Sequence, residues 1–353
     1  MASLLKKGVG WIFSFSPYLL IFGFFALLPL FLKDAYYIRI FIFIGIYMVL
    51  SLSLNLINGY TGLFSIGHAA FYGIGAYSSA LLTLRLGVPF LIALPLSGII
   101  AGIFGYLIGK PALRLTGIFL TLSTLGFNII FVLILINWEG LTRGPLGIAG
   151  IPVPQIFSHS FQRQEDYYYL IFILVLFTLA SNYRLIHSRF GNALLAIRED
   201  ETAAEAVGVN TVHYKMAVFV ISTFYAGLAG SFFAHYIRFI APDNFTFWES
   251  FTLLAMLALG GQGNLAGPVV GASLLIAIPE MFRFLADYRM IFYGLILILM
   301  MLFRREGIFG NRTYPLRLIP PWDKKDTGPR YQRRDKFLPD EGRQGESNGS
   351  AHN

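Results

Sequence analysis

The stretch from Asn55 to Tyr77 gathers polar and small side chains that could contact a solute within an otherwise apolar chain. Its five glycines permit a broken helix, and the backbone groups freed by a break can line a polar cavity. Half-helix ends of this kind bind substrate in several membrane carriers. Close packing of helices with satisfied hydroxyls is an equally good interpretation. The first interpretation makes these residues candidates for a translocation path: Asn55, Asn58, Gly62, Ser65, Gly67, His68 and Tyr72.

A second glycine-rich stretch, residues 259–272, adds Gln262 and Asn264 to the candidate path. Three glycines between residues 260 and 263 disfavour a continuous helix. Pro268 can begin a new helix, because the first turn does not need its missing N–H. We expect either a hairpin turn between two helices or a loop that touches the substrate or gates its path.

A third stretch, residues 184–215, concentrates charge in a chain that carries little. It contains Arg198, Glu199, Asp200 and Glu201 in succession. Residues 191–207 are compatible with one helix, and Gly208 is a plausible stop. Such a charge run is often only a solvated face. The functional alternative is a helix that docks a soluble partner.

The sequence offers no set of residues for catalysis. It has no cysteine, which excludes a thiolate metal site and a cysteine nucleophile. No nucleophile–base pair or metal-ligand spacing occurs, and His68 alone is more typical of a packing residue. The run Gly105–Lys110 resembles a phosphate loop, but it has the wrong spacing and no Ser or Thr follows the lysine. We expect no catalytic residue, no metal and no cofactor in this chain.

The elements that position these residues are predicted to be membrane helices. The 353 residues are 56% hydrophobic and 13% charged, against about 25% charged residues in soluble domains. Residues 1–303 hold 28 of the 46 charged side chains, and the last 50 residues hold the other 18. So few charges cannot cover a soluble fold of this size, which excludes a soluble enzyme, a disordered chain and a disulfide-stapled module. We predict an all-α polytopic membrane protein.

Ten segments are predicted to span the membrane, within a range of eight to ten. A span needs about 20 mostly apolar residues, and three of the ten are shorter. The glycine-rich third, eighth and ninth segments are candidates for broken or re-entrant helices. A division into five and five spans would imply an inverted repeat. The predicted spans are 11–32, 36–57, 62–84, 88–109, 115–137, 167–183, 216–238, 249–263, 266–285 and 288–303.

Lysine and arginine favour an orientation with both termini in the cytoplasm. In that orientation the cytoplasmic side carries 19 of the 27 basic residues, largely because of the tail. The predicted domains are a transmembrane domain over 1–303 and a disordered cytoplasmic tail over 304–353. Within the first, 184–215 is a cytoplasmic loop and 138–166 an extracytoplasmic one. The net charge of +8 is interpreted as loop charge that sets topology beside membrane lipid, not as a nucleic-acid surface.

Several linked motifs together resemble the inner-membrane permeases of branched-chain amino acid ABC importers, and most closely the M-type permeases of the Liv system. The likeness covers residues 35–310 in the order of the family. The first span and the tail are not part of it. The motifs are Asn55–Tyr77, REDETAAEAVG (198–208), FIAPDNFTFWES (239–250), LALGGQGNLAGPVVGA (257–272) and PEMFRFLADYRM (279–290).

The resemblance implies a permease subunit in the cell inner membrane. It also implies a second related permease as heterodimer partner, two cytoplasmic ATPases that bind the ATP, and a periplasmic substrate-binding protein. Permeases of this kind dock the ATPase through a Glu-Ala-Ala-x3-Gly loop. Here the matching residues are Thr202, Ala203, Ala204 and Gly208, with Thr in place of Glu. The proline expected after this motif is absent.

Two alternatives to an importer for leucine, isoleucine and valine stay open. A permease of the same superfamily for urea or short amides would share the pore motifs. A carrier or channel that works alone belongs to a different class, and the scarcity of acidic residues within the spans argues against it.

Overall fold

A computed structural model describes residues 28–29, 34–156, 159–281, 294 and 307–310 of the chain. The described part is built from α-helices, as predicted. The longer helices are α2 (Ala35–Asn55), which continues into the π-helix η1 (Leu56–Tyr60), α3 (His68–Leu86), α4 (Phe90–Ala112), α5 (Ile118–Asn137), α7 (Gln164–Ile186) and α10 (Thr211–Ile237). The shorter elements are α6 (Glu139–Thr142), α8 (Arg189–Glu199), α9 (Glu201–Ala206), α11 (Phe247–Gly260), α12 (Ala266–Met281) and the 3₁₀ turns η2 (Gly144–Leu146) and η3 (Pro242–Phe245).

Two short antiparallel strand pairs lie in the connections. Strand β1 (Ile148–Ala149) pairs with β4 (Phe239–Ile240), and β2 (Gln155–Ile156) pairs with β3 (His159–Ser160). The first pair joins the predicted extracytoplasmic loop to the C-terminal end of α10. Each pair has only two residues a strand, so the strands connect helices and form no layer of their own.

Five helices of the described part are long and apolar enough to cross a membrane. They correspond to the predicted spans 36–57, 88–109, 115–137, 167–183 and 216–238. The predicted spans 11–32 and 288–303 fall outside the described residues except at 28–29 and 294. The count of ten and the inverted repeat therefore stay predictions. The five helices are Ala35–Tyr60, Phe90–Ala112, Ile118–Asn137, Gln164–Ile186 and Thr211–Ile237.

Two of the glycine-rich segments, 62–84 and 249–263, are not helical over their whole predicted length. Helix α11 has 14 residues, which makes it about 21 Å long at 1.5 Å per residue, against a hydrocarbon core of about 30 Å. Helix α3 begins at His68, six residues after the predicted start at 62. Residues 61–67, which precede α3, are not helical.

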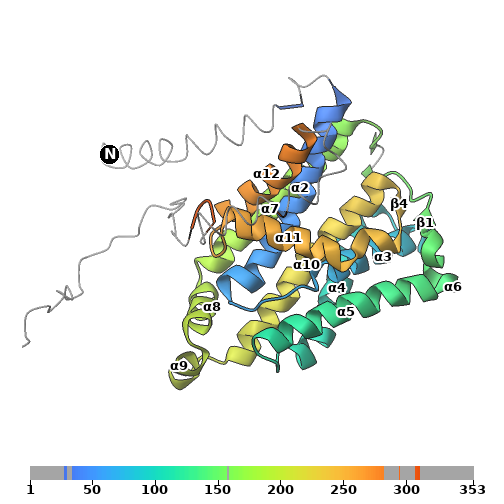
Figure 1. Cartoon of the computed structure of the whole chain (residues 1–353). Helices are drawn as coiled ribbons and strands as arrows, with labels where there is room; N and C mark the ends of the chain where they lie inside the picture. Colours follow the sequence, from blue (N-terminus) through green and yellow to red (C-terminus); the bar gives the residue numbers. More distant parts are fainter. Residues whose placement is uncertain (1–27, 30–33, 157–158, 282–293, 295–306, 311–353) are drawn as a thin grey trace, which may run out of the picture. The chain divides into compact units, whose positions relative to one another are not determined.

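Helix α10 lies at the centre of the described part and packs against α2, α3 and α4 (Figure 1). Glycines allow two of these backbones to touch. A Cβ atom on Gly75 of α3 would lie 2.3 Å from the carbonyl oxygen of Gly227 of α10. A Cβ on Gly230 would lie 2.0 Å from the carbonyl oxygen of Tyr72. Such small-residue contacts are the usual basis of helix association in a bilayer.

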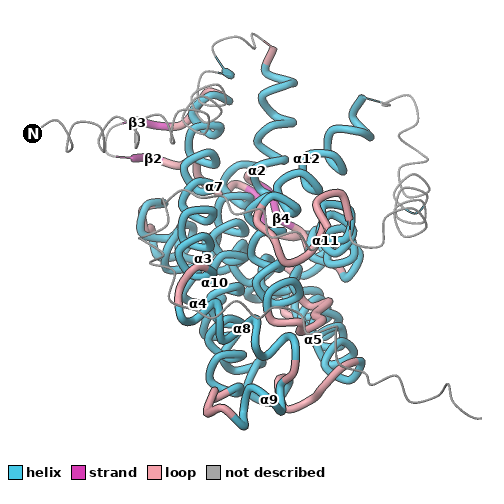
Figure 2. The backbone as a smooth tube through the Cα atoms, turned by 90° about the vertical axis from the view of Figure 1, so that its left-hand side faces the viewer, coloured by secondary structure: helices cyan, strands magenta, loops and turns pink. Residues whose placement is uncertain are grey.

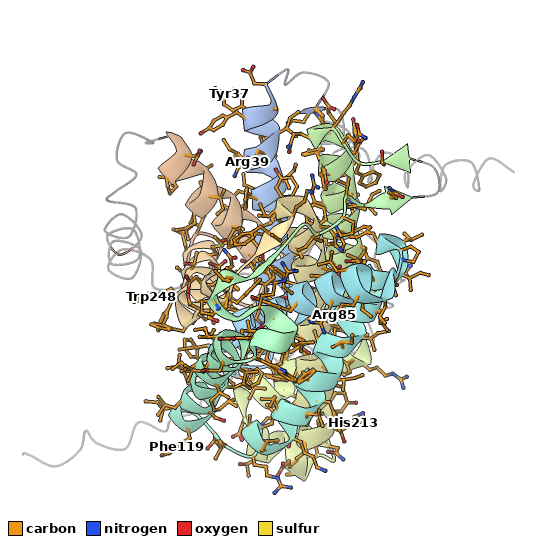
Figure 3. The ribbon with its side chains drawn as sticks, turned by 90° about the vertical axis from the view of Figure 1, so that its right-hand side faces the viewer. Tyr37, Arg39, Arg85, Phe119, His213 and Trp248 are labelled. Atoms are coloured by element: carbon orange, nitrogen blue, oxygen red, sulfur yellow. The ribbon has the colours of Figure 1, made fainter. Side chains whose placement is uncertain are left out.

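The two ends of the described part carry different elements. Helices α8 and α9 lie together at the lower end in two perpendicular views (Figures 1 and 2). Figure 3 places Tyr37 and Arg39 of α2 at the upper end, and Phe119 of α5 and His213 of α10 at the lower end. Helix α2 therefore runs toward α8 and α9, while α10 runs away from them.

Segment 61–67 turns back along α2, with Thr61 and residues 65–67 buried and Gly62 and Phe64 exposed. Helix α2 and η1 end at Tyr60, yet His68 bonds to Ser53, with 2.7 Å between His68 Nε2 and Ser53 Oγ. Ser53 precedes Tyr60 by seven helical residues, which correspond to about 10 Å, so the segment runs back by about that distance along α2. Side chains satisfy its backbone, since the N–H groups of Ser65 and Ile66 donate to Asn58 Oδ1 and Thr124 Oγ1. Internal partners of this kind allow non-helical chain to be buried in a membrane protein, and the broken or re-entrant span stays a prediction.

A second non-helical segment, residues 238–246, leads from α10 into α11. Its Phe245 is fully buried and packs against Tyr72 and Tyr77 of α3. The first turns of α3 and α11 then meet, because Ala69 N donates to Ser250 Oγ at 3.0 Å. In Figure 3 the labelled Trp248, in the first turn of α11, lies between the two ends of the protein.

Candidate functional site

The predicted docking loop folds into two helices. We predicted one helix over 191–207, but the chain breaks at Asp200, which separates α8 from α9. Asp200 is extended, and its Oδ1 accepts a hydrogen bond from Ala203 N at 3.0 Å. Aspartate is a strong N-cap residue, so it ends one helix and begins the next.

Two side-chain bonds hold α9 against the start of α10. Lys215 Nζ pairs with Glu201, and the Lys215 side chain is only 6% exposed. Thr211 Oγ1 donates to Glu205 Oε1 at 2.6 Å. Both bonds join a residue of α9 to a residue in the first turns of α10, so α9 is attached to α10 at this end.

The outward face of α9 is free of contacts within the described chain. Thr202 and Ala203 are exposed, whereas Ala204 points inward and is buried. Val207 is 80% exposed. Gly208 has a φ of +88° and no atom within 4 Å of a Cβ placed there, so it is the predicted helix stop, with left-handed backbone geometry.

Arg198, predicted as a docking residue, points inward. Its Nη1 donates to the carbonyl oxygen of Gly59 at 2.9 Å, and its Nη2 pairs with Glu199 at 2.9 Å. Its side chain is 22% exposed, compared with 73% for Glu199. Gly62 makes room for it, since a Cβ there would lie 2.9 Å from Arg198 Cγ. The structure thus joins the docking loop to the first candidate path segment.

Asn55, predicted to line the path, holds the second glycine-rich turn. Its Nδ2 donates to the carbonyl oxygen of Asn264 at 2.7 Å, and its Oδ1 accepts from Gly263 N at 3.0 Å. Asn55 is completely buried. Both sides of its amide therefore bond to the backbone of the turn, and the buried side chain is not accessible to a solute in this arrangement.

Asn264 organises the turn between α11 and α12. Its Oδ1 accepts from Gly267 N in the first turn of α12, and its Nδ2 donates to the carbonyl oxygen of Gly310 at 3.0 Å. The N–H groups of Ile308 and Phe309 donate to Leu259 and Gly260. Residues 307–310, predicted as part of the tail, therefore pack on the transmembrane part, and residues 311–353 lie outside the description. Gln262 is partly exposed in the same turn.

The remaining candidate path residues lie around the break before α3, and most have partners in the chain. Ser65, Gly67, His68 and Tyr72 are buried. A Cβ on Gly67 would lie 2.5 Å from the carbonyl oxygen of Thr124. Asn58 is buried and accepts from Ser65 N, but its Nδ2 has no partner among the described residues. The contacts of the single chain agree with the packing interpretation, and path lining stays a prediction.

Three further residues shape this region and were missed in the sequence. Thr124 and Ser250 accept the hydrogen bonds that hold the start of α3, and Gly59 lies against Asn55 and Gly263. Gly59 falls inside the glycine-rich stretch and could have been singled out. Thr124 and Ser250 lie in other segments, and no local pattern distinguishes them. Within the described residues no group of three or more His, Asp or Glu could hold a metal ion.

Comparisons with known proteins identify the family of the chain. The family model "Branched-chain amino acid transport system / permease component" matches residues 36–301. The high-affinity branched-chain amino acid transport permease LivM of Salmonella typhimurium is 36% identical over 296 residues, covering 77% of this chain and 70% of that protein.

More distant relatives match as well. A probable branched-chain amino acid permease, LivM of Methanocaldococcus jannaschii, is 23% identical and covers 81% of this chain and 96% of its own. The autoinducer 2 import permease LsrC of Yersinia pseudotuberculosis is 27% identical, over 61% of this chain and 57% of its own. No solved structure matched the chain. On the family match and the 36% identity, the chain belongs to the branched-chain amino acid transport system permease family.

Proposed function

We propose that this chain is the permease subunit of an ATP-driven importer for leucine, isoleucine and valine in the inner membrane. A second related permease completes the pore, two cytoplasmic ATPases bind the ATP, and a periplasmic protein delivers the substrate. Support for the substrate comes from relatives named as branched-chain amino acid permeases. The cytoplasmic placement of both termini belongs to the same proposal.

The observation that carries the proposal is the exposed face of α9. A soluble ATPase needs a rigid, accessible surface that moves together with the membrane helices. Helix α9 is held to α10 through Lys215 and Glu201, yet it exposes Ala203 and Val207. Ala203 and Val207 lie in the stretch that resembles the family's docking motif, and their exposure makes them accessible to a soluble partner.

Co-purification tests the docking surface. The chain is expressed together with its partner subunits, and the ATPase recovered with each variant is measured. Val207→Asp places a charge in the proposed contact, so ATPase recovery should fall at least about tenfold, as about 1.4 kcal/mol of lost binding implies. The matched control is Leu146→Asp, because Leu146 is 83% exposed and lies beside the strand pair at the other end of α10. Equal recovery for both variants contradicts the assignment.

A further inference from the structure

We propose that Arg198 and Asn55 form a coupling joint, through which a movement of α8 reaches the glycine turn between α11 and α12. The joint rests on the proposed function, since it assumes that an ATPase moves α8 and α9. It assigns a positioning role to both residues, in place of the docking contact predicted for Arg198 and the substrate contact predicted for Asn55.

The first link runs from α8 to the end of α2. A helix leaves its last carbonyl groups without helical partners, and the guanidinium of Arg198 satisfies that of Gly59 at 2.9 Å. The positive charge also lies at the negative end of the α2 dipole. Both arms of the guanidinium are engaged within the chain, because Nη2 pairs with Glu199. The side chain is therefore bonded to η1, and a displacement of α8 is transmitted to the Gly59 carbonyl through this hydrogen bond.

The second link runs from the end of α2 to the glycine turn. Asn55 grips the turn at two points, the N–H of Gly263 and the carbonyl of Asn264. Gly59 lies against Asn55 and Gly263, since a Cβ there would be 2.0 Å from Asn55 Oδ1 and 2.5 Å from Gly263 N. No space remains for the end of α2 to move without the turn.

The third link ties the turn to two helices. Helix α11 ends at Gly260 and α12 begins at Ala266. Their backbones are in contact, because a Cβ on Gly260 would lie 1.8 Å from the carbonyl oxygen of Gly267. Asn264 Oδ1 bonds to the first turn of α12 through Gly267 N. A displaced turn therefore moves both helices together.

The joint contains one element that is suited to bending. Residues Leu56–Tyr60 between Asn55 and the break form a π-helix, a geometry that often marks functional sites. Asn55 directly precedes this π-helix, and the Arg198 bond is made to Gly59 within it. Coupling travels through rigid elements with a few discrete joints, and this pair of contacts has that form.

The test compares transport with ATP consumption in the complete importer. The complex is reconstituted in vesicles with Arg198→Ala, Arg198→Lys, Asn55→Ala and the double variant Arg198→Ala/Asn55→Ala. Leucine uptake and ATP hydrolysis are measured in the same vesicles and normalised to the amount of assembled complex. The control is Asn182→Ala, because Asn182 is a completely buried amide that donates to Leu52 outside the joint.

We expect each alanine variant to lower uptake per ATP about tenfold while hydrolysis persists. Arg198→Ala removes a hydrogen bond made by a charged group and Asn55→Ala removes two neutral ones, and both losses are of this order. Uptake per ATP in the double variant should be no lower than in the single variant with the larger loss, because both changes break the same linkage. Arg198→Lys keeps the charge but not the forked geometry, so its loss should be smaller. If Asn55→Ala fails to assemble, the two Arg198 variants still decide the question.

Three results overturn the joint: an unchanged ratio of uptake to hydrolysis, losses that multiply in the double variant, or an equal loss in Asn182→Ala. Failure of the proposed function looks different. If the wild-type chain recovers no ATPase, the importer assignment fails and the joint with it. If the ATPase is recovered and the ratio stays constant across the variants, only the joint is wrong.

Discussion

Replacing Gly59 by alanine tests the tightest contact in the region. A Cβ at this position would lie 2.0 Å from Asn55 Oδ1 and 2.5 Å from Gly263 N. Real Cβ atoms do not approach that closely, so Asn55 or the turn must move. Movement of Asn55 breaks its bonds to Gly263 and Asn264. One methyl group therefore disturbs both the packing and the two-point grip.

The magnitude follows from these two effects. Overpacking a well-packed site costs about 1–3 kcal/mol. Two weakened hydrogen bonds cost about 0.5–1.5 kcal/mol each, which brings the total to about 2–6 kcal/mol. At about 2 °C per kcal/mol for a chain of this size, the midpoint of thermal unfolding should fall by about 4–12 °C.

The assay heats the purified complex and follows the loss of its monodisperse peak in size-exclusion chromatography. Unfolding of membrane proteins in detergent is often irreversible, so midpoints are compared at one heating rate. The control is Gly126→Ala in α5, where no atom lies within 4 Å of the added Cβ. Alanine is also the better helix former there, by up to about 1 kcal/mol, so the control should be neutral or slightly stabilised.

A double variant identifies the cause of the loss. Once Gly59→Ala has broken the Asn55 bonds, Asn55→Ala should add less than its own separate effect. Equal midpoints for Gly59→Ala and Gly126→Ala would refute the reasoning, because they would show that the turn does not lie against Gly59. The second link of the joint would fail with it.

Three other predictions follow from the contacts. Gly75→Val should abolish recovery of folded permease, because its Cβ meets the Gly227 backbone at 2.3 Å, whereas Gly126→Val should still fold, as gel filtration would show. Glu201→Ala leaves the Lys215 ammonium, on a side chain that is 6% exposed, without its carboxylate. Since Glu201 is 40% exposed, this variant should lose about 1–3 kcal/mol of stability, below the range for a fully buried pair. It should also recover less ATPase. The control variant Glu165→Ala should show neither loss. Reconstituted vesicles should take up leucine and not urea, and only with ATP and the ATPases present. Uptake by the chain alone would indicate an independent carrier, and urea uptake would favour the short-amide alternative.

Much of the helical framework could be predicted from composition alone. The starts of α2 and α12 lie within one residue of the prediction, because long apolar runs and Pro268 mark them. The start of α3 was wrong by six residues, since glycine-rich sequence shows that a helix breaks and not where it resumes. That point depends on Thr124 and Ser250. The break at Asp200 could have been predicted, because aspartate before a run of helix formers is a common N-cap.

The orientation of Arg198 could not be predicted from the sequence. Its hydrogen-bond partner Gly59 lies 139 residues away, and the partner atom is a backbone carbonyl, which any residue carries. A run of charges surrounded by helix formers indicates an exposed face, and Glu199 conforms to that expectation. Arg198 differs from it only because α8 crosses the end of α2, which is a property of tertiary packing.

The packing and path interpretations of residues 55–77 would require two different states of the same residues. In this structure the N–H groups of Leu63, Ser65 and Ile66 bond to the chain itself. Leaving each of them buried without a partner would cost about 1–3 kcal/mol. A substrate can therefore bind to these N–H groups only if it replaces their partners within the chain. Such a replacement requires the segment to move away from Thr124 or Asn58. The coupling joint lies at the end of α2, where this segment begins. An ATP-driven displacement of α8 would act first on the residues whose bonds have to open.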